Sequence, residues 1–137
     1  MPELKRSQIG KTGCIGEDAA AAYLTGAGYE ILDRNIRYGK LELDIVYKED
    51  RYTVFAEVKS RTVPKNPQLS RYGSPATAVT YAKQKKLIAA ARLYLADKHP
   101  GGYPRFDIIE VYLKKDTQTQ SPVMDHINHI RNAFTSH

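Results

Sequence analysis

The sequence lacks the features that mark secreted and membrane proteins. Cys14 is its only cysteine, so neither an intrachain disulfide nor a zinc site built from several cysteines can form. No apolar run approaches the roughly 20 residues that cross a bilayer, and residues 1–10 lack the apolar segment of a cleavable signal peptide. Internal repeats and low-complexity segments are also absent. We therefore expect a cytoplasmic protein.

Positive charge exceeds negative charge along the chain. There are 21 lysines and arginines against 15 acidic residues, which gives a net charge of +6 and a pI near 9.4. A basic protein favours a polyanionic partner, with nucleic acid first and an acidic membrane surface second. The length of 137 residues and the hydrophobic content of 42% fit one ordinary globular domain.

The first half of the chain combines one helix pattern with three strand patterns. Four consecutive alanines favour a helix that ends at Gly26 or Gly28. Runs of apolar and β-branched residues then indicate strands, and a polar turn around Asp50 and Arg51 joins two of them in a hairpin. The predicted elements are a helix at 16–27 and strands at 29–37, 41–48 and 52–61.

The second half is predicted to add a long helix, a strand and a terminal helix. Ser74 and Pro75 form an N-cap and first-turn signature for the long helix. The resulting order of helix, three strands, helix, strand and terminal helix predicts an α/β fold, a mixed sheet flanked by helices. The elements of this half are an exposed loop at 62–75, a helix that ends at about Asp97 or Lys98, a strand at 106–113 and an amphipathic helix at 123–134.

The predicted hairpin brings two carboxylates together. Alternation places Asp44 on the same face of its strand as Glu42, with leucines and Ile45 on the other face, while Glu57 and Lys59 share a face of the next strand. A turn centred between residues 50 and 51 sets Asp44 directly opposite Glu57. Like charges in this position need a cation, and paired carboxylates are also the ligands that Mg²⁺ prefers.

Two helices are predicted to direct further charged residues toward this hairpin. Glu17 continues the apolar stripe of the first helix, and Lys83 lies at the start of the inward stripe of the long helix. Other cations could form a patch that binds a phosphate backbone. The predicted nucleic-acid-binding residues are Lys83, Lys86, Arg61, Lys65 and Arg71, with Lys85 and Arg92 nearby.

Several short segments occur together around these residues. Asp44, twelve residues and then Glu57-Val58-Lys59 follow the PD-(D/E)XK nuclease signature. With the other segments, the sequence resembles the YraN-like family of uncharacterised proteins, related to archaeal Holliday junction resolvases. The resemblance implies one restriction-endonuclease-like domain at 9–134 after a flexible segment at 1–8. The other segments are Gly16-Glu17-Asp18, GYEILDRN at 28–35, LELDIV at 41–46, FAEVKSR at 55–61, Ala78-Val79 with Lys83, and Arg105-Phe106-Asp107.

The resemblance implies a resolvase-type catalytic quartet of Glu17, Asp44, Glu57 and Lys59. Asp44, Glu57 and the backbone carbonyl of Val58 would hold Mg²⁺ or Mn²⁺, which polarises the scissile phosphate. Lys59 would orient or activate the attacking water. Glu17 would hold a metal-bound water or a second cation.

Lys83 would contact phosphate in this scheme.

The sequence departs from the family pattern at two positions close to the site. Leu41 replaces the glycine of the family's Gly-Glu-Ile-Asp run, which changes the backbone freedom near Asp44. Leu43 stands where the nuclease signature has a proline.

Three functions are compatible with the sequence. The first is a metal-dependent DNA endonuclease that hydrolyses phosphodiester bonds, on branched or other structured DNA in repair or recombination. The second is a catalytically inactive nucleic-acid-binding module of the same fold. The third is a protein-interaction subunit that uses the terminal helix or an oligomeric face. No membrane partner is expected, and analogy with resolvases, which act on two strands, suggests a homodimer.

Structural explanations compete with the site roles. Asp44, Glu57 and Lys59 would also form a cross-strand salt bridge on an exposed sheet face. Glu17 is favourable near any helix N-terminus, and Lys83 could extend its amine to solvent. Each of these residue types is therefore compatible with both a structural and a functional role.

Four further residues are assigned structural or surface positions. Arg105 and Asp107 are expected to form an ion pair at a strand end. His126 and His129 lie three residues apart on the predicted terminal helix and have no third ligand in view, so we expect surface histidines and no metal site. Tyr72 in the basic loop is the best candidate among ten tyrosines to stack on a base.

Overall fold

A computed structural model gives the fold, and it describes residues 11–63 and 79–136, with the backbone alone for residues 11–13. Five strands form one mixed sheet in the order β1-β2-β3-β4-β5. β3 and β4 pair in parallel, and the other neighbours are antiparallel. The elements are α1 (Lys11–Gly26), β1 (Glu30–Tyr38), β2 (Leu41–Glu49), β3 (Tyr52–Thr62), α2 (Tyr81–Lys98), β4 (Tyr103–Lys115) and β5 (Pro122–Phe134).

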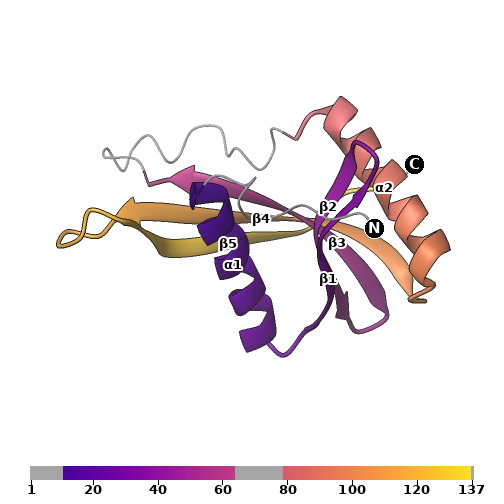
Figure 1. Ribbon diagram of the computed structural model, residues 1–137. Coiled ribbons are helices and arrows are strands. Elements are labelled where there is room, and N and C mark those ends of the chain that lie inside the picture. Colours follow the sequence, from indigo (N-terminus) through magenta and orange to yellow (C-terminus); the bar gives the residue numbers. More distant parts are fainter. Residues whose placement is uncertain (1–10, 64–78, 137) are drawn as a thin grey trace.

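The two helices pack against opposite faces of the sheet (Figure 1). α1 covers the face that carries Ile45, Tyr47 and Val54, and α2 covers the face that carries Phe55 and Phe106. α2 lies between β3 and β4 in the chain, as a parallel pair requires. This mixed sheet flanked by helices is the predicted α/β fold class, and it is consistent with a restriction-endonuclease-like fold.

α1 forms because its alanine run has high helix propensity and because one side of it is apolar. Ala20 and Leu24 are fully buried against the sheet. The helix ends at Gly26, and Gly28 has a φ of 92°, a left-handed conformation that glycine adopts without strain. The Tyr29 amide then donates to the Leu24 carbonyl at 3.1 Å, so the chain turns directly into β1.

The β2–β3 hairpin has the register that the sequence predicts. Glu49 pairs with Tyr52, which leaves a two-residue turn, and Asp50 in this turn has a φ of 55°. The pairing continues from there up to Ile45 opposite Ala56. The next residues along the two strands are Asp44 and Glu57, so the turn places the carboxylates at the same level of the sheet.

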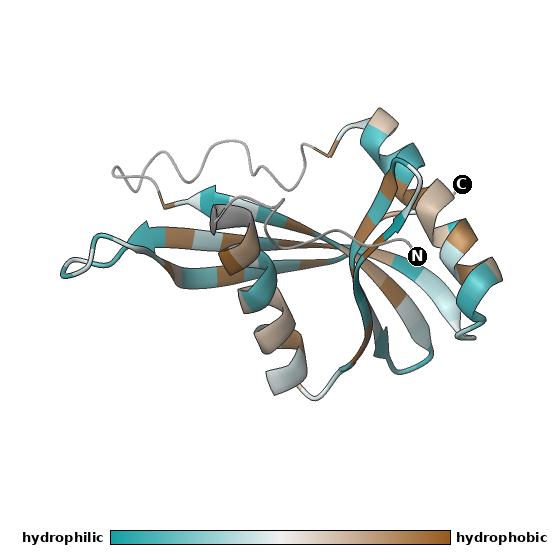
Figure 2. Cartoon of the chain, in the orientation of Figure 1, coloured by the Kyte–Doolittle hydropathy of each residue, from teal (hydrophilic) through white to brown (hydrophobic). Residues whose placement is uncertain are grey.

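Side chains on β4 and β5 alternate between the two covered faces. Bands of hydrophobic and hydrophilic residues follow one another along these strands (Figure 2). On the α2 face an aromatic row crosses the sheet, because Phe106 stacks on Phe55 with ring centroids 5.7 Å apart and on Phe134 at 5.0 Å. Tyr94 of α2 meets Phe55 edge-on at 5.8 Å and fixes the helix to this row.

The predicted terminal helix at 123–134 is wrong, because these residues form β5 and pair antiparallel with β4. The apolar spacing that suggested a helix has another origin. Ile127 packs on the α1 face, whereas Ile130 and Phe134 pack on the α2 face. Residues three apart on a strand point to opposite faces, so a strand with apolar contacts on both sides mimics helical spacing.

The predicted start of the long helix also needs correction. Ser74 and Pro75 lie outside the described residues, and the described helix begins at Tyr81. Thr80 is its N-cap, because the Thr80 hydroxyl accepts a hydrogen bond from the Lys83 amide at 3.1 Å. The predicted end at Lys98 is confirmed. Within the described residues no helix is long and apolar enough to cross a membrane.

Asp107 forms the most extensive polar contacts of the α1 face. It is fully buried, and Arg105 donates to both of its oxygens at 2.9 Å. The Tyr47 hydroxyl donates to Oδ2 at 2.7 Å, and His129 Nε2 lies 2.7 Å from the same oxygen. The Asn132 amide donates to Oδ1 at 3.0 Å. The expected Arg105–Asp107 ion pair is therefore confirmed, within a network that fixes β5 to β4.

These contacts control the pKa of Asp107. Burial would raise the pKa, but hydrogen bonds from His129, Arg105 and the Asn132 amide outweigh burial and hold the pKa well below its ordinary value. The folded value is thus lower than the unfolded value of about 3.9. Ionised Asp107 therefore stabilises the fold above about pH 4, and this contribution is lost as the pH falls toward the folded pKa.

We expect Asp107→Asn to reduce the free energy of unfolding at pH 7 by about 3 kcal/mol, because it leaves the buried Arg105 guanidinium with Glu49 as its one remaining carboxylate partner among the contacts described. The difference from the wild type should shrink as the pH falls below about 4. Urea unfolding followed by circular dichroism between pH 3 and pH 7 measures both effects. Asp50→Asn, at an exposed aspartate of the β2–β3 turn, is the control and should change little at any pH.

Candidate functional site

The candidate site lies where β2 separates from β3. Main-chain pairing between the two strands stops at Ile45 and Ala56, although β3 continues to Thr62. Beyond this point the Asp44 carboxylate replaces the main chain, because its Oδ2 accepts the Val58 amide at 2.9 Å. The side chain of Asp44 is therefore held at the fork between the strands by a hydrogen bond that β2 would otherwise supply.

The backbone of β2 does not alternate regularly at this fork. Leu43 packs in the cluster on the α2 face, and Ile45 packs in the cluster on the α1 face. The sequence predicts one shared face for these two residues, which is wrong. Because β2 leaves its partner at Asp44, the strand can rotate there, and the regular period of two residues fails.

Glu57 is the central carboxylate of the site. It is 6% exposed, and two lysines approach its Oε2: Lys59 Nζ at 3.4 Å and Lys83 Nζ at 3.7 Å. Lys59 follows on the same strand, and Lys83 comes from the first turn of α2. The structure thus brings together the β3 carboxylate and ammonium with the predicted α2 cation.

Glu17 enters from α1 on the other side of the sheet. It is 6% exposed, and Arg34 Nη2 of β1 lies 3.5 Å from its Oε1 and 2.7 Å from Asp18. Gly16 lets the helix approach β3, because a Cβ atom there would overlap the Ser60 hydroxyl. Sequence reasoning assigned no role to Arg34, although it lies within the segment GYEILDRN.

The three acidic groups act on one another. Burial raises the pKa of Asp44 well above its ordinary range, and the charges of Glu57 and Glu17 raise it further. The hydrogen bond from the Val58 amide lowers it, but by less than these effects combined. Lys59 and Lys83 beside Glu57 supply positive charge next to this pair.

This donor set fits a hard divalent cation. Asp44 and Glu57 supply carboxylate oxygens, which Mg²⁺ and Mn²⁺ prefer, and Mg²⁺ needs only one or two such ligands because it keeps several waters. Within residues 11–63 and 79–136, no group of three or more His, Cys, Asp or Glu side chains is arranged to hold a metal ion. Asp44 and Glu57 are therefore the candidate side-chain ligands of this site.

Comparison with known proteins gives the family of this chain. The model of the uncharacterised protein family UPF0102 matches residues 16–111. The chain belongs to the UPF0102 family. A UPF0102 protein of Caldanaerobacter subterraneus subsp. tengcongensis is 38% identical over 132 residues, which cover 96% of this chain and all of the relative. A UPF0102 protein of Clostridium botulinum strain Loch Maree is 40% identical and covers 89% of this chain and 92% of its own length.

A third UPF0102 protein, from Chloroherpeton thalassium, is 43% identical over 102 residues, or 74% of each chain. The resemblance to this uncharacterised family, which the sequence motifs indicate, is therefore confirmed. The residues matched by the family model include Glu17, Asp44, Glu57 and Lys59, and all of α2. The names of the relatives state no activity.

The predicted nucleic-acid-binding residues of this UPF0102 protein occupy different positions. Lys83 lies at the carboxylate pair, and Lys86 is exposed on α2. Arg61 lies further along β3, with its Nε 3.9 Å from Glu110 Oε2. Lys65 and Arg71, like Tyr72, lie outside the described residues.

The two histidines differ in burial. His126 is exposed, as expected, with 55% of its side chain accessible. The surface position expected for His129 is wrong, because its side chain is only 4% exposed and lies between Asp107 and the Tyr23 hydroxyl, 2.8 Å from Nδ1. Sequence reasoning also missed Glu110, which is fully buried. Its position in an apolar strand is the one signal that could have identified it.

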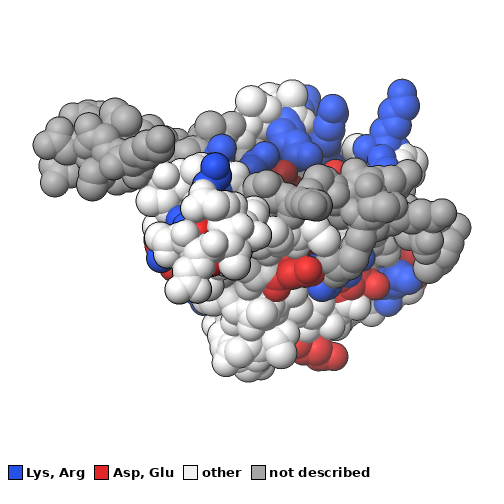
Figure 3. Space-filling model, turned by 60° about the vertical axis from the view of Figure 1, so that its left-hand side comes forward, with Lys and Arg blue, Asp and Glu red and all other residues white. Residues whose placement is uncertain are grey.

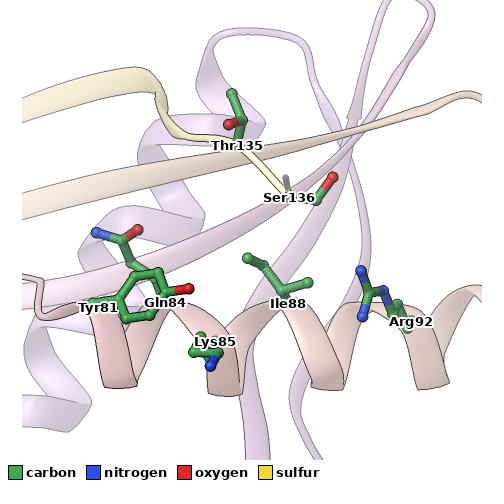
Figure 4. A pocket seen from close by; sticks show the side chains of 7 residues that line it. All are labelled: Tyr81, Gln84, Lys85, Ile88, Arg92, Thr135 and Ser136. Atoms are coloured by element: carbon green, nitrogen blue, oxygen red, sulfur yellow. The ribbon is translucent and has the colours of Figure 1, made fainter.

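Basic side chains and a concave pocket mark other parts of the surface. Lysines and arginines gather in the upper part of the face in Figure 3, with acidic groups mostly below them. A pocket of about 190 Å³ lies between α2 and the end of the chain, with Lys85 and Arg92 among its lining (Figure 4). Helical geometry places these two cations on the side of α2 away from Lys83, so this pocket is separate from the carboxylate pair.

Removal of one carboxylate should relieve the charge repulsion at the fork. The pKa of Asp44 is higher in the folded protein than in the unfolded chain. At low pH the carboxyl group is protonated and does not destabilise the fold, whereas the free energy of unfolding decreases as the pH rises through the folded pKa. We therefore expect metal-free Asp44→Asn to be more stable than the wild type at pH 8 by up to about 1 kcal/mol.

The difference should disappear toward pH 4. Thermal unfolding in the presence of a chelator measures it, with Asp50→Asn as the matched exposed control. A variant that is less stable than the wild type at pH 8 would show that the carboxylate contributes a net stabilising contact.

Proposed function

We propose that this UPF0102 protein is a metal-dependent DNA endonuclease whose centre is the Asp44–Glu57 pair with Lys59. The observation that supports this most is the convergence of a buried carboxylate, Glu57, and a half-buried one, Asp44, whose pKa is strongly raised, beside two lysines. A purely structural pair would place opposite charges together. This site also places like charges together, while Lys59 and Lys83 pair with Glu57 at 3.4 and 3.7 Å.

Different residues of the site would perform different steps of phosphodiester hydrolysis. Asp44 and Glu57, with the Val58 carbonyl, would hold Mg²⁺ or Mn²⁺, which supplies Lewis-acid stabilisation of the charge that develops on the phosphate. Lys59 is close enough to Glu57 to orient a water molecule at the same centre. Lys83 would neutralise a phosphate oxygen.

Glu17 and Arg34 would complete the site from the side of α1. The negative charge of Glu17 raises the pKa of Asp44. Glu17 would therefore strengthen the attraction of the site for a cation. Arg34 holds Glu17 at 3.5 Å and fixes the position of its carboxylate. The net charge of +6 supports a nucleic-acid substrate. Branched DNA as the preferred substrate, and a homodimer, stay predictions from the resemblance.

A nucleic-acid-binding module without turnover is the second candidate. It is favoured by one observation, since no three acidic, histidine or cysteine side chains of the described residues form a metal site. The third sequence-based alternative, an interaction subunit, loses the terminal helix as its docking element, because residues 122–134 form β5, and an oligomeric face is the form of it that remains.

Metal binding at the carboxylate pair predicts ligand-dependent stability. We expect Mn²⁺ or Mg²⁺ to raise the melting temperature of the wild type by several degrees, because a ligand at 100 times its Kd stabilises by about 2.7 kcal/mol. Glu57→Gln should abolish this shift. Glu42→Gln is the matched control on β2, since Glu42 is 37% exposed and lies 3.8 Å from Arg37. A shift of equal size in Glu57→Gln would place the metal elsewhere.

Cleavage assays test the activity itself. Wild-type protein with Mg²⁺ or Mn²⁺ should cleave four-way-junction or linear DNA, and Asp44→Asn should reduce the rate at least about a hundredfold, because metal-dependent charge stabilisation contributes several kcal/mol. Lys59→Met should reduce the rate while metal-dependent stabilisation remains. Glu42→Gln should keep the wild-type rate.

The same assays separate the two candidates. DNA binding that weakens steeply with salt and persists in Asp44→Asn, with no cleavage by the wild type on any of these substrates, would establish the binding module. Cleavage that survives in both Asp44→Asn and Glu57→Gln would reject the proposed centre.

A further inference from the structure

The polar surface of the α2 face continues beyond the carboxylate pair. Cross-strand registers align one residue each from β3, β4 and β5 in successive rows. The row after Glu57 contains Lys59, Glu110 and Asn128. The row after that contains Arg61, Tyr112 and His126, and we call it the distal row. These rows lie on the long arm of β3, β4 and β5, away from α2 (Figure 1).

A buried carboxylate holds the distal row in place. Glu110 is fully buried, and Asn128 Nδ2 donates to its Oε1 at 2.9 Å. The Tyr112 hydroxyl donates to the same oxygen at 3.4 Å, and Arg61 Nε lies 3.9 Å from Oε2. Because a buried polar group is costly without partners, these contacts with Glu110 limit the freedom of the surrounding side chains.

Tyr112 and His126 form a stacked pair of rings. Their centroids are 4.4 Å apart and their planes differ by 6°. His126 Nδ1 lies 2.6 Å from Asp125, whose other oxygen is 3.3 Å from Lys114 Nζ, so the histidine ring is also fixed. His126 remains 55% exposed. Tyr112 is half-buried. An accessible aromatic ring stacked on a second ring beside an arginine is a combination that binds a base and its phosphate in single-stranded nucleic acids.

We propose that the distal row is a nucleobase-stacking subsite, in which the Tyr112–His126 pair contacts a base and Arg61 contacts the adjoining phosphate. This inference rests on the proposed function, since it assumes that the same strand reaches Glu57. Arg61 lies four residue steps along β3 from Glu57, about 13 Å along the strand. That distance corresponds to about four base steps of a stacked strand. Stacking accepts every base, so the subsite has no sequence preference.

Photochemical crosslinking tests the contact directly. The wild-type protein, with a chelator to prevent cleavage, is mixed with a single-stranded oligothymidylate of about 20 nucleotides that carries 5-iodouracil. Irradiation and mass spectrometry should identify crosslinked peptides that contain Tyr112 or His126. Crosslinks confined to other aromatic residues, such as Tyr81 at the α2 pocket, overturn the proposal.

Binding measurements test the role of the rings. We expect Tyr112→Ala and His126→Ala to raise the Kd for the unmodified oligothymidylate about five- to a hundredfold at constant salt. The slope of log Kd against log salt should not change, because neither variant removes a phosphate contact. Tyr112→Phe keeps the ring and should bind within about twofold of the wild type. Tyr103→Ala is the matched control, since Tyr103 is an exposed tyrosine of the same strand.

An abasic oligonucleotide distinguishes stacking from a change in folding. It should bind the wild type and Tyr112→Ala equally, because it has no base to stack. Equal weakening of the abasic and base-containing probes would overturn the subsite. Should Tyr112→Ala fail to fold, His126→Ala at the exposed ring carries the same comparison.

The crosslinking and cleavage experiments distinguish failure of the subsite from failure of the metal centre. Crosslinks at Tyr112 or His126 without any cleavage in Mg²⁺ or Mn²⁺ support the subsite and reject the endonuclease. Cleavage that depends on Asp44, without crosslinks or base-dependent affinity at the distal row, supports the endonuclease and rejects the subsite.

Discussion

The hydrogen bond from the Val58 amide to the Asp44 carboxylate determines how the candidate site is built. It occurs where β2 stops pairing with β3, so a side chain satisfies a donor that the neighbouring strand would otherwise satisfy. Because the strands separate there, groups from both faces of the sheet can meet. Glu17 from the α1 side and Lys83 from the α2 side reach the same carboxylate pair. A continuous ladder would have kept these two layers apart.

Two aspartates of this chain, the fully buried Asp107 and the half-buried Asp44, have opposite electrostatic surroundings. Asp107 receives hydrogen bonds from four side-chain and main-chain donors, and its pKa is held low. Asp44 receives one such hydrogen bond and faces two further carboxylates, and its pKa is raised. The first arrangement is complete without any ligand and stabilises the fold. The second keeps like charges close together and raises the pKa of one of them, which is typical of functional sites.

The sequence predicted those parts of the site that depend on local geometry. A two-residue turn determines the hairpin register, so the levels of Asp44 and Glu57 followed from counting residues. Contacts between distant segments could not be predicted in this way, which is why Arg34 and the burial of Glu110 were missed. β5 was assigned as a helix because apolar residues on both of its faces contact the core. Its apolar spacing therefore reflects two partners, and His129 became buried with it.

The crossover connection of β3 to β4 has a consequence for the order of assembly. β1, β2 and β3 pair through short turns, whereas the parallel β3–β4 pair requires closure of the connection that contains α2. Local pairs form with less loss of chain entropy than distant ones. We therefore expect the acidic hairpin to form before the helix delivers Lys83. The charge repulsion at the fork would then act on the folding transition state as well as on the finished protein.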